Sequence, residues 1–167
     1  MARKKLQATL SKNSFNQLAK QVEMFGSQYI KGIQIGVEEA TKQLYETIIK
    51  KLNDNNLSNH IGNVYYSYDN LARIGKVWTD DIVIIFHEFG TGVKGTQDNW
   101  ASLFDYQVNQ SGKGEKGWYF YNENGDYGGI THGLSTKHIF YESLMEIKKQ
   151  LPKTMSVSVS RTIGEMY

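Results

Sequence analysis

Four histidines and one neighbouring glutamate supply most of the candidate chemistry in this chain. The histidines are His60, His87, His132 and His138, and the sequence contains no cysteine. Without cysteine, the chain cannot form disulfides, thiolate zinc sites, iron–sulfur clusters or a cysteine nucleophile. Zinc can take three ligands such as His87, Glu88 and His132. A zincin helix, however, needs a second histidine four residues after the first. The pattern therefore favours a His87 that faces solvent or pairs with Glu88, and we expect neither a metal nor another cofactor.

Two other short patterns could carry chemistry. Asp80 and Asp81 are adjacent acids, which can bind magnesium or act in acid–base catalysis, but neighbours on a strand point to opposite faces. A solvated turn is therefore expected there. Residues 90–95 are glycine-rich like a phosphate-binding loop but lack its Gly-Lys-Ser/Thr ending, and no serine lies in a nucleophile elbow. We therefore expect no enzymatic activity, with a metal-dependent hydrolase as the distant alternative.

The composition is that of one globular domain spanning residues 1–167. Hydrophobic residues make up 40% and aromatic residues 13%, so the chain can form a core and is not intrinsically disordered. With 19 basic and 17 acidic residues, the net charge is +2, which is too small for a dedicated electrostatic nucleic-acid binder. The longest strongly apolar run, residues 82–86, is far too short to span a bilayer, so no membrane association is expected. Eleven tyrosines favour a protein that makes contacts with other proteins.

The longest expected element is a helix over residues 13–52. Its apolar residues recur at spacings of three or four, which predicts one continuous apolar stripe. A straight helix of this length runs about 60 Å, well past a compact domain with a radius of gyration near 15 Å. The helix must therefore bend near Gly26, or part of its stripe must pack on another chain. Gly32 and Gly36 share a face, where they are either simply tolerated or allow close backbone approach.

The middle of the chain reads as mostly β. Strands are expected at residues 64–68, 73–78, 82–89 and 118–121, with 82–89 as the central strand. A short helix capped by Asp98 is expected within residues 98–108, and turns are expected at 124–126 and at 128–129. Residues 1–12 are interpreted as a basic flexible arm and 107–117 as a mobile loop.

The last third is expected to contain a helix and a strand. Residues 135–151 fit a helix capped by Ser135 or Thr136 and ended by Pro152. Residues 154–162 alternate between apolar residues and serines, which predicts a half-buried strand. The predicted fold is α+β: a long N-terminal helix, a mostly antiparallel sheet of about four to five strands, a second helix near the C-terminus and a final C-terminal strand.

Several motifs occur in an order that resembles a known family. Residues 86–92 read Phe-His-Glu-Phe-Gly-Thr-Gly, residues 117–120 read Gly-Trp-Tyr-Phe, and residues 131–133 read Thr-His-Gly before the C-terminal helix. Over residues 13–160 this order is similar to that of the tail-completion, or head–tail joining, proteins of long-tailed bacteriophages. The chain departs from the family in having no proline at residues 137–140.

The resemblance implies a virion structural protein of the neck, made in the host cytoplasm. Copies would form a ring, expected to be a hexamer, that completes the tail below the head-closure or adaptor protein and above the tail terminator or tail tube protein. DNA would pass through the lumen without specific binding. A tail terminator, or the equivalent part of a phage-tail-like particle, is the alternative.

The resemblance also points to candidate contacts between subunits. These are Glu88, Phe89, Gly90, Thr91, Gly92, Trp118, Thr131 and Gly133. From the residues themselves, Gly90 and Gly92 are expected to adopt positive φ and give a sharp exit from a buried strand. Glu88 is expected at the rim of the sheet, where it could pair with a basic residue of a neighbouring subunit.

Overall fold

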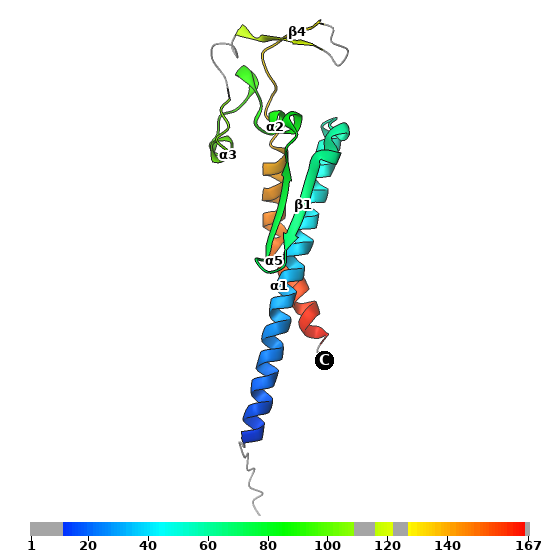
Figure 1. Ribbon diagram of the computed structural model, residues 1–167, viewed down its shortest axis with the longest axis vertical. Coiled ribbons are helices and arrows are strands. Elements are labelled where there is room, and N and C mark those ends of the chain that lie inside the picture. The colour runs from blue at the N-terminus through cyan, green and yellow to red at the C-terminus, as the bar shows by residue number, and fades with distance from the viewer. Residues whose placement is uncertain (1–11, 109–115, 122–126, 166–167) are drawn as a thin grey trace, which may run out of the picture.

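A computed structural model describes residues 12–108, 116–121 and 127–165 (Figure 1). Its first element is α1 (Lys12–Asp54), a 43-residue helix that confirms the helix expected over residues 13–52. The helix continues through Gly26 without interruption. At 1.5 Å per residue it is about 65 Å long, and its N-terminal part, blue in Figure 1, extends beyond the other elements.

The second long helix, α5 (Ile139–Gly164), packs antiparallel on the C-terminal part of α1. Gly32 faces Val159 so closely that an added Cβ would lie 2.7 Å from the Val159 Cα. An added Cβ on Gly36 would lie 2.7 Å from the sulfur of Met155. Of the two readings of this glycine pair, close backbone approach is therefore the correct one.

The C-terminal helix differs from the prediction in both its start and its end. It begins after His138, rather than at the expected caps, and it continues across Pro152 to Gly164. The strand expected at residues 154–162 is therefore wrong. Pro152 is exposed; it lacks an amide donor, and its ring crowds the carbonyl four residues earlier. The residues after it nevertheless remain helical, with Met155 and Val159 packed against α1.

Those contacts follow a helical rather than an alternating pattern. Met155 faces Gly36, and Ser158 and Thr162 are buried. Ser158 Oγ donates a hydrogen bond of 2.6 Å to Glu39, and Arg161 donates a second of 2.6 Å to the same carboxylate. These two bonds, that from Ser158 first, lower the pKa of Glu39. The serines thus do not form one polar face, because Ser158 lies against α1.

A β-hairpin lies along the same half of α1. It consists of β1 (Val64–Asp69) and β2 (Ile74–Thr79), which pair antiparallel with Val64 opposite Thr79. These bounds confirm the two strands expected at residues 64–68 and 73–78. A 3-10 helix, η1 (Ser58–Asn63), connects α1 to β1.

The expected central strand at residues 82–89 is wrong, because this segment is the helix α2 (Ile82–Phe89). Asp81 caps it: its carboxylate accepts hydrogen bonds from Val83 N at 2.8 Å and Ile84 N at 3.4 Å. An apolar run of eight residues has no periodicity that separates a buried strand from a buried helix. With this strand and the C-terminal one absent, the described residues form two separate two-stranded sheets instead of one larger sheet.

The remaining elements follow α2. They are η2 (Gly92–Lys94), α3 (Asn99–Leu103), β3 (Trp118–Tyr121) and β4 (Tyr127–Thr131). The expected Asp98 cap is confirmed, since its side chain accepts from Ala101 N at 2.9 Å, although α3 is shorter than expected. The expected strand at 118–121 is confirmed. The turn expected at 128–129 is wrong, since both glycines lie in β4.

The α+β class is confirmed, with fewer strands than predicted. The turn at 124–126, the arm apart from Lys12, and residues 109–115 of the expected mobile loop lie outside the described residues. The core lies where α1, β1, α2 and α5 converge and contains Ile48, Leu52, Leu57, Val64, Ile84 and Ile139. Within the described parts of the chain, every helix is too short or too polar to cross a membrane.

Candidate functional site

The site is built around the carboxylate of Glu88, in the last turn of α2. Its side chain is buried, and Oε1 accepts hydrogen bonds from Trp100 Nε1 at 2.7 Å and from Tyr141 N at 2.9 Å. Its Oε2 accepts from Phe140 N at 2.7 Å. Phe140 and Tyr141 belong to the first turn of α5, where amides have no partner within the helix. Glu88 therefore caps α5 from a different helix.

This arrangement explains the unusual start of α5. His138, the residue at the N-cap position, has a left-handed backbone and makes no side-chain cap bond. An acidic group near the positive end of a helix dipole is stabilising. The expected position of Glu88 at a sheet rim is wrong, because the segment is a helix. Since its carboxylate already binds three donors of its own chain, the structure gives no support for an ion pair with a neighbouring subunit.

Gly90 ends α2 and turns the chain sharply. Its φ is +73° and that of Gly92 is +59°, which confirms the positive φ values expected at both positions. A Cβ on Gly90 would lie 2.6 Å from the Cα of Gly95 and from Thr136 Oγ1. The exit is from a helix and not from the expected strand, but the requirement for glycine is the same.

Thr91 joins this turn to the segment that follows β4. Its amide donates to Leu134 O at 2.9 Å, and its Oγ1 accepts from Leu134 N at 2.9 Å. Gly133, with φ of +114°, packs so closely that an added Cβ would overlap the carbonyl oxygen of Thr91. Thr131 Oγ1 accepts from Gly133 N at 3.1 Å, and Trp118 is the strand partner of Thr131.

All eight candidate residues thus belong to one end of the molecule (Figure 1). The structure brings them together within one chain, as a junction that ties α2, β4 and the start of α5 to one another. The sequence proposed these residues as contacts between subunits, which stays a prediction; the structure shows the contacts that they make within the chain.

Aromatic residues beside this junction were not singled out as site residues by the sequence. Phe89 stacks on Tyr106 with ring centroids 4.7 Å apart, and Trp100 meets Phe104 edge-on at 4.9 Å. Tyr106 Oη donates to Gly90 O at 2.9 Å, and burial raises the pKa of this phenol. The available signal was the clustering of three aromatic residues within residues 100–106, immediately after the glycine-rich loop.

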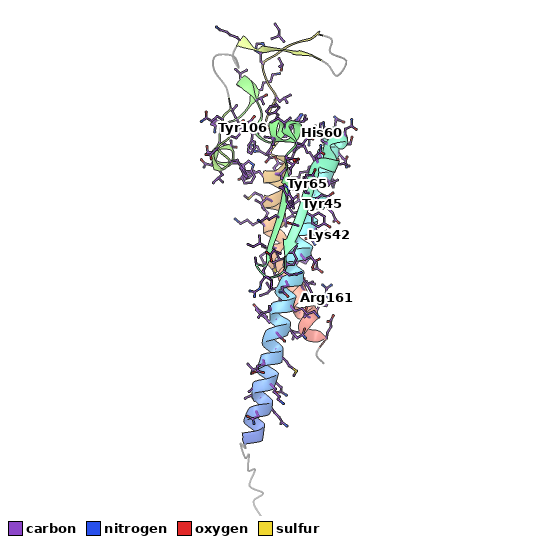
Figure 2. All side chains as sticks on the ribbon, viewed as in Figure 1. Lys42, Tyr45, His60, Tyr65, Tyr106 and Arg161 are labelled. Atoms are coloured by element: carbon purple, nitrogen blue, oxygen red, sulfur yellow. The ribbon has the colours of Figure 1, made fainter. Side chains whose placement is uncertain are left out.

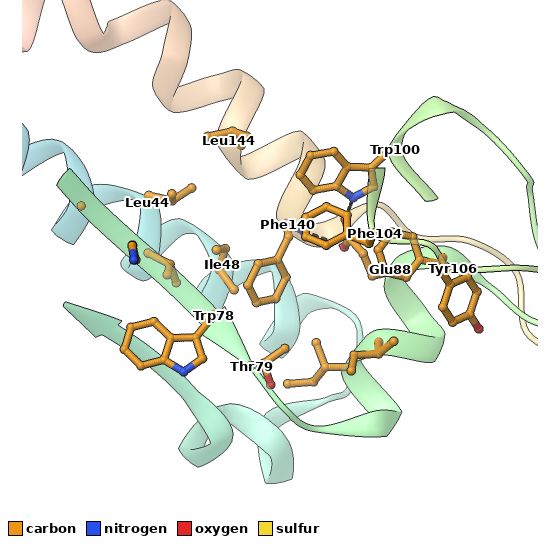
Figure 3. Close-up of a pocket in the computed structure, with 16 residues that line it drawn as sticks. Leu44, Ile48, Trp78, Thr79, Glu88, Trp100, Phe104, Tyr106, Phe140 and Leu144 are labelled. Carbon is orange, nitrogen blue, oxygen red and sulfur yellow. Dashed lines mark hydrogen bonds between the residues drawn. The ribbon is translucent and has the colours of Figure 1, made fainter. Parts of the chain in front are cut away.

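These rings form one wall of an open apolar groove of about 620 Å³ (Figure 3). Leu44 and Ile48 of α1, Trp78 of β2, and Phe140 and Leu144 of α5 form other parts of its lining. Two of these side chains remain accessible: Phe104 is 60% exposed and Leu144 37%. Because the only carboxylate in the lining, that of Glu88, is already hydrogen-bonded, the groove presents mainly apolar surface.

A second apolar surface lies on the N-terminal part of α1. Leu18, Val22, Phe25 and Tyr29 are 47–63% exposed there; Tyr29 is level with the last turn of α5, and the other three lie past its end. Their spacing of four, three and four residues continues the stripe that α5 covers farther along the helix. We call these four residues the α1 stripe. It is the surface anticipated when the helix was predicted to outrun its domain.

The loop after α2 does not have the arrangement of a phosphate-binding loop. The amides of Thr91, Val93 and Gly95 donate to carbonyl groups of the chain itself, at 2.9, 3.1 and 3.2 Å. These donors are therefore not directed toward a common point where a phosphate could bind.

The structure also offers no metal centre at His87. In the described part of the chain, no three His, Asp or Glu side chains are grouped so that they could hold a metal ion. His87 Nδ1 is buried without a hydrogen-bond partner, and burial lowers the pKa of this histidine. The hydrolase alternative with His87, Glu88 and His132 thus lacks its ligand set.

Asp81, expected in a solvated turn, instead organises the start of α2. Besides capping the helix, its Oδ2 accepts from Asn63 Nδ2 at 2.6 Å and lies 2.8 Å from His60 Nδ1. Burial raises the pKa of Asp81, but the hydrogen bonds from Asn63, His60 and Val83 outweigh that effect and lower the pKa to about 2. Asp80 does not share this role in the structure.

Figure 2 shows the order of labelled side chains along the molecule. His60 and Tyr106 lie near one end, and Tyr45, Lys42 and Arg161 follow at increasing distance from that end along α1 and α5. The junction and the groove are therefore near one end, and the uncovered part of α1 is at the other. Comparisons with protein-family models, curated proteins and solved structures found no match to this chain.

Proposed function

We propose that this chain is a virion structural protein of the neck of a long-tailed bacteriophage. Copies form a homo-oligomeric ring, six-fold in this proposal, that completes the tail and joins it to the head connector. The ring contacts a head-closure or adaptor protein above and a tail terminator or tail tube protein below. DNA passes through the lumen, and the chain performs no catalysis.

The observation that carries this proposal is the uncovered α1 stripe. In a monomer, these four large apolar side chains, which are 47–63% exposed, remain in contact with water. Contiguous exposed apolar surface marks an interaction site. Such a surface is expected of a subunit whose fold is completed by its neighbours, as in a ring.

A second line of support is the order of motifs around the junction. Residues 86–92, 117–120 and 131–133 carry the resemblance to head–tail joining proteins. In the structure, the third motif pairs with the second at Thr131 and contacts the first at Gly133. Motifs that are separate in the sequence thus form one structural unit.

Electron microscopy of lysates tests the proposal. The parent phage is grown with this gene silenced, with and without a plasmid copy of the gene. Full heads beside separate tails of normal length, restored to joined particles by the plasmid, are the expected result. Joined particles in the silenced lysate would refute the proposal. Free tails of abnormal length would instead indicate the tail-terminator alternative.

A further inference from the structure

We propose that the α1 stripe of one copy docks in the apolar groove of the neighbouring copy, so that each copy both gives a helix and receives one. This inference rests on the proposed function in one respect, namely that copies of the chain form a closed ring. It specifies the contact that closes the ring.

The stripe has the form of a helix that binds in a groove. Amphipathic helices bind grooves through apolar anchors at positions i, i+3 or i+4, and i+7. Leu18, Val22 and Phe25 have this spacing, and Tyr29 extends it by one more turn. The same face of α1 farther along is covered by α5, so the stripe continues an existing helix–helix interface past the point where its partner ends.

The groove has the matching chemistry. Its lining is mainly apolar, and the accessible side chains Phe104 and Leu144 come from the end of α3 and from α5. Aromatic side chains are enriched at the centres of protein interfaces, where they contribute most of the binding energy. A helix with Leu, Val, Phe and Tyr anchors is thus a chemically suitable occupant.

The stripe cannot reach the groove of its own chain. Leu44 of the groove and Val22 of the stripe are on the same continuous helix, 22 residues apart, which is about 33 Å. Because α1 is one uninterrupted helix between them, the two surfaces can meet only between copies. A contact between two different patches is heterologous, and it produces rings when the rotation between copies closes.

Pairing of two stripes is the competing arrangement. It would be isologous, would be satisfied by two copies and would leave every groove open. Stripe-in-groove docking covers both apolar surfaces of every subunit. The structure therefore favours a second copy, bound head to tail, as the occupant of the groove.

The absence of native cysteines allows a direct test by cross-linking of the full chain. Two single-cysteine variants, Val22→Cys and Leu144→Cys, place thiols at exposed positions of the stripe and the groove. The variants are mixed, incubated at high concentration to allow subunit exchange and treated with a short bismaleimide. Lys42→Cys, on an exposed part of α1 between the two surfaces, replaces Val22→Cys in the control mixture.

The expected result is a covalent dimer in the mixture of Val22→Cys and Leu144→Cys, at least tenfold more abundant than in either variant alone or in the control. Peptide mass spectrometry should join residues 22 and 144. A Val22–Val22 product without the mixed product would overturn the inference in favour of paired stripes. Absence of any specific product would also overturn it.

The mass of the assembled particle separates failure of this inference from failure of the proposed function. Native mass spectrometry is applied to the same samples before cross-linking. A ring that forms without the mixed product would refute stripe-in-groove docking and leave the ring intact. Joined phage particles in the silenced lysate described above would refute the neck function itself.

Discussion

The cap that Glu88 provides for α5 predicts how strongly the fold depends on one carboxylate. Replacing Glu88 by Ala removes the acceptor of three hydrogen bonds, those from Trp100 Nε1, Phe140 N and Tyr141 N, at 2.7, 2.7 and 2.9 Å. Hydrogen bonds to charged groups contribute about 1.5–3 kcal/mol each, and buried donors left without a partner cost about 1–3 kcal/mol. Water entering from the adjacent groove can satisfy part of this loss.

We therefore expect Glu88→Ala to lower the free energy of unfolding by about 3–5 kcal/mol. Glu88→Gln keeps one side-chain oxygen but places an amide donor among amide donors and removes the charge, so a loss of about 1–3 kcal/mol is expected. Urea unfolding followed by circular dichroism and tryptophan fluorescence measures both. Glu46→Ala, which alters an exposed glutamate on α1, is the matched control and should change stability by less than about 0.5 kcal/mol.

The result that would refute the capping argument is a Glu88→Ala chain as stable as the Glu46→Ala control. The prediction also affects how phage experiments are interpreted. Loss of head–tail joining in a Glu88 variant would not by itself demonstrate an inter-subunit contact, because the same substitution removes the cap of α5. Only a variant with normal stability and defective joining would do so.

Three further outcomes are expected. Gly133→Ala forces a side chain into a left-handed backbone against a carbonyl group, so the thermal unfolding midpoint of the protein should fall by several degrees. Gly62→Ala, with open space around residue 62, should change the midpoint little, and equal midpoints for the two variants would contradict the packing at Gly133. Gly32→Ala should destabilise the α1–α5 pair by more than about 1 kcal/mol in urea, while Gly26→Ala, which meets no atom within 4 Å, should increase helicity by circular dichroism. Asp81 has its pKa lowered from 3.8 to about 2, so its ionised form stabilises the fold above pH 4 and this contribution is lost as the pH falls toward 2. Asp81→Asn keeps a capping oxygen, so its stability should decline less steeply between pH 4 and 2; a parallel decline would show that the charge is not responsible.

Local sequence patterns were sufficient where one periodicity was sustained over many residues or where strand formers were flanked by turns. The 43-residue α1 and the strands Val64–Asp69 and Trp118–Tyr121 were predictable for this reason. The helix α2 (Ile82–Phe89) was not, because an unbroken apolar run looks the same in a buried strand and a buried helix. Asp81 before the run was the available capping signal.

The helical conformation of the C-terminal half of α5 could not be predicted from the sequence for a different reason. Residues 154–162 alternate in polarity, but tertiary contacts decide their conformation. Gly36 gives space to Met155, and Glu39 binds the Ser158 hydroxyl. None of these partners is local, because they lie more than 115 residues earlier in the sequence. The sequence singled out the residues of the site, but it did not predict that they contact one another within one chain. The capping role of Glu88 could not be predicted either, because it depends on α2 and α5 meeting.

The pairing of the first long helix with the last one also determines when the chain can fold. Arg161 and Glu39 are 122 residues apart, and contacts of such separation slow folding because the intervening chain must first be brought together. At roughly 5–20 residues per second of synthesis, Arg161 of α5 is made roughly 6–24 seconds after Glu39 of α1. Throughout that time the face of α1 that α5 covers has no partner, although the hairpin and α2 can already pack on its C-terminal part. Folding of this protein is thus completed only after translation of α5, and nascent α1 is a predicted substrate for chaperones that bind exposed apolar helices.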